Sequence, residues 1–265
     1  MSYLFDPDNW EWLVTANNAR FILEGFLVNL QIAVIAMVLS LLIGLALALL
    51  RLSRRRLVSV PAGAWIDVFR NLPLIFLILY LALGLPAPWK DAYESVVPGF
   101  LPDALQSGLV LAALMGLVLY NSAVLAEIMR AGIQSLDRGQ GEAAKALGLT
   151  YRQSMRLVIL PQGLRRMVPA TVSQLITLNK DTTLVSIIAI PEVMRHGRIV
   201  NGFNFFGGVE APILQVFVFV GLLFVIVNLA LSRLSRRLEL RERRRTGTTL
   251  KRVRGLEDQV GIEPA

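Results

Sequence analysis

The sequence contains no cysteine and only one histidine, His196. The absence of cysteine excludes disulfide bonds, thiolate nucleophiles and sulfur-ligated metal sites. A single histidine also argues against histidine-based metal sites and Ser/His catalytic triads. Because no other catalytic group of residues stands out, we expect neither an enzyme active site nor a metal site in this chain.

Charged residues are also scarce: they make up 17% of the chain, whereas 55% is hydrophobic and the mean hydropathy is +0.59. A water-soluble domain that exposed so much apolar surface would lose about 25 cal/mol for each Å². The composition therefore predicts a membrane protein.

Long runs without charged residues indicate where the chain crosses the membrane. Four such runs reach the roughly 20 residues that a helix needs to span a bilayer, namely residues 25–50, 71–89, 104–126 and 211–232. A fifth stretch, residues 167–191, has a suitable length but contains Lys180 and Asp181. We expect an all-α polytopic membrane protein with about five transmembrane helices.

Basic residues predict the orientation of these helices, because cytoplasmic loops are enriched in lysine and arginine. Residues 51–56, residues 130–169 and the segment after Ser232 together hold 21 of the 27 basic residues. We therefore place the amino terminus outside and the carboxyl terminus in the cytoplasm. The expected domains are an extracytoplasmic segment (1–20), a transmembrane domain (21–232) and a basic cytoplasmic tail (233–265), partly disordered and attracted to anionic lipid rather than to nucleic acid.

The inner loop of residues 130–169 is too long for a simple connection between two helices. Residues 142–147 favour a helix that Gly148 can end, and Thr150 can cap a second helix running toward Leu160. Pro161 is expected to end that second helix. The sequence thus predicts two short helices beneath the membrane.

This loop resembles the EAA loop of ATP-binding-cassette (ABC) importer permeases. In that loop, a Glu-Ala-Ala run is followed by a glycine and then by a Leu-Pro pair. Flanking segments near Phe69, Tyr120, Ile159 and Leu178 are similar to the polar amino-acid uptake permeases. The sequence Arg70-Asn71-Leu72-Pro73 resembles the glutamate-type branch. By this resemblance, the residues that couple to an ATPase are Glu142, Ala143, Ala144, Leu147, Gly148, Leu160 and Pro161.

The resemblance implies a type I ABC importer permease in the bacterial inner membrane. Such a protein pairs with a second permease as a homo- or heterodimer, docks an ABC ATPase subunit and receives substrate from an extracytoplasmic solute-binding protein. The chain contains no G-x-x-x-x-G-K-[ST] phosphate loop, so ATP is expected to bind to the separate ATPase. We expect no cofactor in this chain.

Polar residues within the predicted spans are candidates for a substrate pathway, because charges inside a membrane are costly and usually functional. The candidates are Arg70, Asn71, Asn121, Ser122, Lys180, Asp181 and Thr182. Lys180 and Asp181 can bind the carboxylate and ammonium of an amino acid, or each can pair with a neighbouring helix, for example Asp181 with Arg70. For Asn121 and Ser122, helix packing is the favoured alternative.

The substrate is expected to be an acidic amino acid, glutamate before aspartate, because Arg70 and Lys180 can compensate its additional negative charge.

Two spacings of three residues, Asp67 with Arg70 and Glu127 with Arg130, favour ion pairs within a helix. Two other interpretations stay open. The inner loop can be an amphipathic helix lying on lipid, and the chain can be a stand-alone secondary transporter of amino acids.

Overall fold

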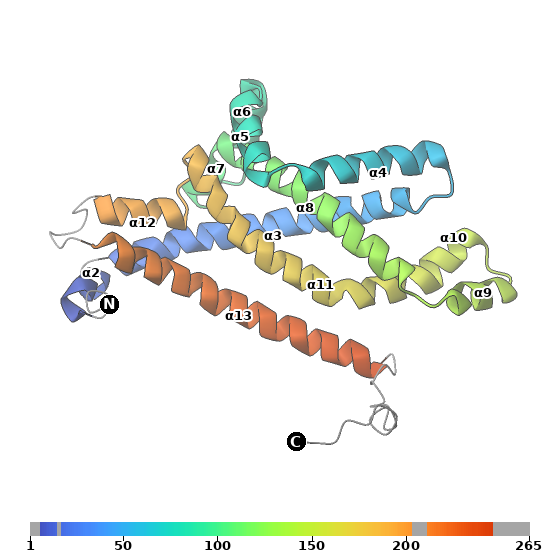
Figure 1. Cartoon of the computed structure of the whole chain (residues 1–265). Coiled ribbons are helices and arrows are strands. Elements are labelled where there is room, and N and C mark those ends of the chain that lie inside the picture. Colours follow the sequence, from blue (N-terminus) through green and yellow to red (C-terminus); the bar gives the residue numbers. More distant parts are fainter. Residues whose placement is uncertain (1–5, 15–16, 203–210, 246–265) are drawn as a thin grey trace, which may run out of the picture.

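The computed structural model describes residues 6–14, 17–202 and 211–245, and these residues form helices without any strand (Figure 1). This confirms the predicted all-α class. The elements are η1 Pro7–Trp10, α2 Glu11–Val14, α3 Asn18–Arg51, α4 Arg56–Asn71, α5 Leu74–Gly84, α6 Ala87–Val96, α7 Asp103–Gln106, α8 Gly108–Gln134, α9 Arg138–Ala146, α10 Tyr151–Ser154, η2 Met155–Ile159, α11 Leu160–Asp181, η3 Thr182–Ile188, α12 Val193–Gly202 and α13 Ile213–Arg245.

Three helices of the described residues, α3, α8 and α13, are long and apolar enough to cross a membrane. The pair α4 and α5 also qualifies if the two helices, bent by 98°, are counted as one broken span. The fifth predicted span corresponds to α11 followed by the 3-10 helix η3. α11 is not among the apolar spans because it carries several charged side chains and has a polar face.

The second predicted span, residues 71–89, is wrong in its bounds. The helix begins much earlier, at Arg56, and α4 ends at Asn71 before the chain turns into α5. Leu72 has an extended backbone, as expected for a residue that precedes a proline. Asp67 and Arg70 interrupted the apolar run and so concealed the amphipathic helix α4.

Pro161 does not end a helix, which corrects the prediction for the inner loop. Helical backbone continues from Tyr151 to Asp181, and Pro161 lies in the first turn of α11. The five residues before Leu160 form a wide π-helical turn, η2. Such a turn is a usual way to accommodate an irregularity in helical hydrogen bonding, and the first turn of a helix tolerates the missing N–H of proline.

The core forms where α3 crosses α8, and α11 packs against α8 on its way to α13 (Figure 1). Small residues make this crossing close: Ala33 and Ala36 of α3 and Ala112 and Ala113 of α8 are all buried. Separate apolar clusters hold the two ends of the bundle. At one end, Trp12, Ile22, Phe26, Val193, Val216 and Val220 join α2, α3, α12 and α13. At the other, Ala48, Ile66, Ala123, Ala126, Met129 and Met167 join α3, α4, α8 and α11.

Large apolar side chains remain exposed along the outward faces of α3 and α13. They include Val34, Val38, Leu42, Leu222, Val225, Ile226 and Leu229. An exposed apolar surface of this extent fits contact with lipid or with another subunit. α13 continues as a helix into the basic tail as far as Arg245, and the remainder of the predicted tail lies outside the described residues.

Candidate functional site

The inner loop presents a short helix, α9, at one end of the bundle (Figure 1). Asp137 caps its amino terminus by accepting a hydrogen bond from the backbone N–H of Gly139 at 2.8 Å. Ala144 is buried, whereas Glu142 is exposed and Leu147 is 81% exposed. α9 therefore exposes a carboxylate, Glu142, and the residue that follows the helix, Leu147, is an exposed leucine.

The turn after α9 has the geometry that the sequence predicts. Gly148 has a φ of +77°, a left-handed conformation that glycine adopts without strain. Thr150 and Gln153 then form a capping box, in which Gln153 Oε1 accepts from Thr150 N–H at 2.9 Å. The second helix thus starts in a fixed direction relative to α9.

Side-chain contacts tie this loop to α8 and α11. Gln162 donates from Nε2 to Gln140 Oε1 at 3.1 Å, and Arg166 donates from Nη1 to the carbonyl of Ser135 at 2.7 Å. Ser135 directly follows α8, while Gln162 and Arg166 belong to the first turns of α11. The first contact joins α9 to α11 and the second joins α11 to the end of α8, so the three helices are linked in series.

A second connection joins the loop to the turn between α3 and α4. The guanidinium of Arg54 lies 4.6 Å from the centre of the Tyr151 ring, within the range of a cation–π interaction. Tyr151 also donates from its hydroxyl to the carbonyl of Leu52 at 3.5 Å. The loop is thus anchored at two places on the membrane helices.

By their ion pairs and hydrogen bonds, the candidate pathway residues fall into separate groups. Arg70 and Asn71 lie at the end of α4, where Arg70 contacts Asp67 at 3.6 Å and Glu127 of α8 at 3.9 Å. Glu127 also pairs with Arg130 at 2.7 Å. Both predicted intrahelical ion pairs are therefore confirmed, and Arg70 additionally links α4 to α8.

Asn121 and Ser122 are fully buried in α8. Asn121 Oδ1 accepts a hydrogen bond from Gln174 Nε2 of α11 at 2.7 Å, and Ser122 donates to the carbonyl of Leu119 in its own helix. These contacts agree with the favoured alternative, helix packing. One turn and a half further along α11, Asn179 donates from Nδ2 to Asn228 Oδ1 of α13 at 3.1 Å.

Thr182 belongs to a third group, in which Asn29 of α3 is central. Asn29 Nδ2 lies 3.0 Å from Thr182 Oγ1 and 3.0 Å from Glu192 Oε2, and Asn29 Oδ1 accepts from the N–H of Val193. Glu192 Oε1 accepts from the N–H of Arg195 and so caps α12. Burial raises the pKa of the Glu192 carboxyl, while its hydrogen bonds to backbone N–H groups and to Asn29 oppose that shift.

Lys180 and Asp181, which lie within the predicted span 167–191, are the last residues of α11, a helix that begins at Leu160. Lys180 is exposed and Asp181 is partly buried. In the part of the chain that the structure describes, no ion pair joins Asp181 to Arg70, whose partners are Asp67 and Glu127. The suggested Asp181–Arg70 pair is therefore wrong.

Sequence reasoning missed Asn29, Gln174 and Glu192. Asn29 had a usable signal, since an amide within the longest apolar run requires a hydrogen-bonding partner. Glu192 follows Ile190-Pro191 and precedes a helical segment, a position suited to a capping residue. Gln174 is likewise an amide within a predicted span, residues 167–191, but its partner, Asn121, is 53 residues away in the sequence and could not be identified from it.

Comparisons with known proteins place these features in a family context. Residues 16–244 match the family described as "binding-protein-dependent transport system inner membrane component". The chain is 37% identical to a probable glutamine ABC transporter permease protein, GlnP, of Bacillus subtilis, over 84% of this chain and 94% of that protein. It is 34% identical to the glutamate/aspartate import permease protein GltK of Escherichia coli O6:H1, over 85% of this chain and 95% of that protein.

A third relative is the arginine transport system permease protein ArtQ of Bacillus subtilis, 32% identical over 87% of this chain and 96% of that protein. Among solved structures, an amino acid ABC transporter crystallised with histidines matches with a TM-score of 0.68 and 26% identity, over 84% of this chain and 94% of that one. An inward-facing MetNI methionine ABC transporter matches in fold, with a TM-score of 0.61 and 19% identity, over 82% of this chain and 96% of that chain.

Proposed function

Because the chain belongs to the family of binding-protein-dependent transport system inner membrane components, we propose that it is the membrane permease subunit of an ATP-driven importer of polar amino acids. Its similarity to glutamine, glutamate/aspartate and arginine permeases supports this substrate class. Family membership argues against the alternative of a stand-alone secondary transporter. It is an integral protein of the inner membrane, and we place its amino terminus outside.

The observation that carries the proposal is the construction of the inner loop. α9 exposes Glu142 and Leu147 at the end of the molecule, and Gly148 with the Thr150 cap fixes its direction relative to α11. Contacts from Gln162, Arg166 and Tyr151 connect this loop to α8, α11 and the α3–α4 turn. Such a stiff element can transmit the displacement of a docked motor to the membrane helices.

The proposed partners follow from this division of labour. ATP binds to an ABC ATPase subunit, because this sequence has no phosphate-binding loop of its own. That subunit docks on α9. A second permease, identical or related, completes the translocation path, and an extracytoplasmic binding protein delivers the substrate. The exposed apolar faces of α3 and α13 supply surface for the second permease and for lipid.

Glutamate is our proposed substrate within this class. Lys180 at the end of α11 carries positive charge near the predicted membrane spans, as does Arg70 at the end of α4, although Arg70 also pairs with Asp67 and Glu127. Positive charge compensates the second carboxylate of glutamate in a medium of low dielectric constant. Asp181 provides a carboxylate that can accept the substrate ammonium.

Co-purification with the ATPase subunit tests the proposed function. The tagged permease is expected to retain the ATPase through affinity purification, and Leu147→Asp should release it by placing a charge on the docking surface. Phe100→Asp is the matched control, because Phe100 is similarly exposed, at 86%, but lies between α6 and α7. Loss of the ATPase with Phe100→Asp but not with Leu147→Asp would contradict docking on α9.

A further inference from the structure

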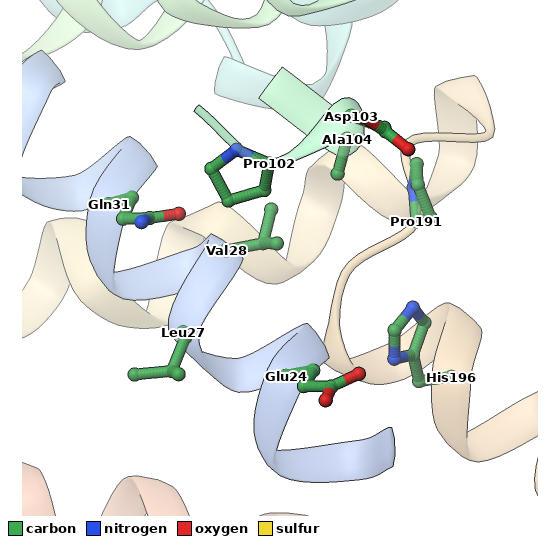
Figure 2. Close-up of a pocket in the computed structure, with 9 residues that line it drawn as sticks. All are labelled: Glu24, Leu27, Val28, Gln31, Pro102, Asp103, Ala104, Pro191 and His196. Carbon is green, nitrogen blue, oxygen red and sulfur yellow. The ribbon is translucent and has the colours of Figure 1, made fainter. Parts of the chain in front are cut away.

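A cavity of about 480 Å³ lies between the first turns of α3, the start of α7 and α12 (Figure 2). We propose that this cavity binds a primary ammonium group, that of a neutral or cationic amino acid or that of an amino-phospholipid. The first of these two sources rests on the proposed function. The cavity is separate from Arg70, Lys180 and Asp181, none of which lines it.

The shape of the cavity is set by one face of α3. The residues of α3 that line the cavity are three or four positions apart, a spacing that places side chains on the same side of a helix. They are Glu24, Leu27, Val28 and Gln31. From Glu24 to Gln31 the helix rises about 10 Å. The volume and this length are typical of a site for a small molecule.

The electrostatics of the cavity favour a cation. Its walls carry two carboxylates, Glu24 and Asp103, and none of its nine lining residues is a lysine or an arginine. Glu24 pairs with Arg20 through Oε1 only, at 2.9 Å, and both side chains are exposed, so this pair screens Glu24 weakly. Within the described residues, the Asp103 carboxylate has no hydrogen-bond or ion-pair partner.

One uncharged polar side chain that lines the cavity, His196, also offers an acceptor. His196 Nδ1 lies 2.6 Å from the carbonyl of Phe21, so the neutral ring donates there and presents Nε2 as an acceptor. Burial lowers the pKa of His196, which favours the uncharged ring.

The position of His196 depends on a glycine in α3. A Cβ atom at Gly25 would lie 2.7 Å from His196 Nδ1 and 3.0 Å from Val193 Cα. The absence of a side chain at Gly25 therefore lets α12 approach α3 closely enough to bring the imidazole to the cavity. Figure 2 shows His196 and Glu24 at one end of the space and Asp103 on the opposite wall.

A primary ammonium satisfies this arrangement because it has a positive charge and three N–H donors and no acceptor. The apolar walls, which include Leu27, Val28, Pro102 and Pro191, can receive the aliphatic part of the ligand. A carboxylate in the ligand side chain would meet the two like charges of Glu24 and Asp103. We therefore expect cationic and neutral amino acids, which have only the α-carboxylate, to bind more tightly here than glutamate, which has two carboxylates.

Binding to the intact permease in nanodiscs of pure phosphatidylcholine tests the amino-acid source. Glutamine, followed by saturation-transfer NMR, is expected to bind, whereas N-acetylglutamine, which lacks the ammonium, is not. Glu24→Gln or Asp103→Asn should each weaken glutamine binding about tenfold, the factor for one charge-assisted hydrogen bond. Asp91→Asn, which changes an exposed carboxylate of α6 outside the cavity, should have no effect.

Nanodiscs that contain phosphatidylethanolamine test the lipid source. If this lipid occupies the cavity, it co-purifies with the permease, competes with glutamine and is lost in the Asp103→Asn variant. If binding of glutamine or of phosphatidylethanolamine requires Glu24 and Asp103, the ammonium site is supported and its occupant is identified. Equal binding of glutamine and N-acetylglutamine, or no change in the Glu24→Gln/Asp103→Asn double variant for either ligand, overturns it.

Uptake by the complete transporter separates this inference from the proposed function. If the wild-type transporter shows ATP-driven uptake but the cavity binds no ammonium, the cavity assignment fails and the permease function stands. If the wild type shows no ATP-driven uptake while the cavity binds amines, the permease function fails instead.

Discussion

Asn29 of α3 donates a hydrogen bond from Nδ2 to Oε2 of Glu192 over 3.0 Å, although the two residues are 163 positions apart. Both side chains are fully buried. Through the additional contacts of Asn29 with Thr182 and Val193, this pair holds the end of α11 and the start of α12 against α3. The arrangement fixes the junction of α3, η3 and α12 around a single amide.

Exchanging the two polar groups tests this relationship. Asn29→Asp alone replaces the donor by a second carboxylate facing Glu192, and we expect it to destabilise the protein by about 3–5 kcal/mol, the usual cost of an unpaired buried charge. Adding Glu192→Gln restores a donor opposite the new carboxylate, so the double variant should recover much of the lost stability. Thermal unfolding in detergent measures both effects.

The Glu192→Gln variant alone is the control for this exchange. It places two amide donors together and should cost about 1–3 kcal/mol, the penalty for an unsatisfied buried group. If the double variant is as unstable as the sum of the two single variants, Asn29 and Glu192 are not energetically coupled.

Gly148 allows a paired comparison of two substitutions. Its φ is +77°, a conformation that asparagine tolerates but that strains a β-branched residue. No atom lies within 4 Å of the position that a new Cβ atom would take. Gly148→Val should therefore redirect α9 and reduce amino-acid uptake per ATP hydrolysed, whereas Gly148→Asn should retain most of it. Parallel ATPase and uptake assays in proteoliposomes measure this ratio.

Because no atom lies within 4 Å of the new Cβ position, steric crowding at Cβ does not explain a difference between the two variants. Equal, near-normal uptake by well-expressed Gly148→Val protein would remove this turn from the coupling mechanism.

Local patterns in the sequence predicted the inner loop well. The helix around Glu142–Ala144, the turn at Gly148 and the cap at Thr150 depend on residues a few positions apart, and the structure has all three. The membrane helices α3, α8 and α13 were predicted from charge-free runs alone. Each ends beyond its predicted bound, α3 begins earlier than predicted, and α8 and α13 begin a few residues later.

Features that depend on tertiary contacts were not predictable in this way. α4 was missed because Asp67 and Arg70 interrupt its apolar pattern, and in the folded chain Arg70 is compensated by Glu127 of another helix. The continuation of helix through Pro161 required the wide turn η2. The partners of Asn29 and Asn121 come from distant segments, and no single-sequence periodicity reveals such pairs.

Lys180 and Asp181 carry our proposal of an acidic substrate. Lys180→Met should slow glutamate uptake while the protein still assembles with its ATPase, because a positive charge that compensates the substrate is removed. Asp181→Asn should weaken recognition of the substrate ammonium. Competition assays with glutamate, glutamine and arginine measure the preference, and stronger competition by arginine than by glutamate would contradict the acidic substrate while leaving the permease assignment intact.

The orientation of the chain can be measured by cysteine labelling, since the sequence has no native cysteine to give a background signal. Cysteines introduced at Lys90 and His196 should react in intact cells with a membrane-impermeant thiol reagent. Cysteines at Arg54, Gly148 and Arg244 should react only after the membrane is opened. Labelling of position 148 from outside would show that the proposed orientation is wrong.

The most direct test of the permease assignment is uptake of a radiolabelled amino acid into proteoliposomes that contain this chain, its second permease and the ATPase subunit. With binding protein outside and ATP at the ATPase face, we predict accumulation against a concentration gradient, and no accumulation when ATP or the ATPase subunit is omitted. Concentrative uptake by this chain alone, driven by an ion gradient without ATP, would contradict the account.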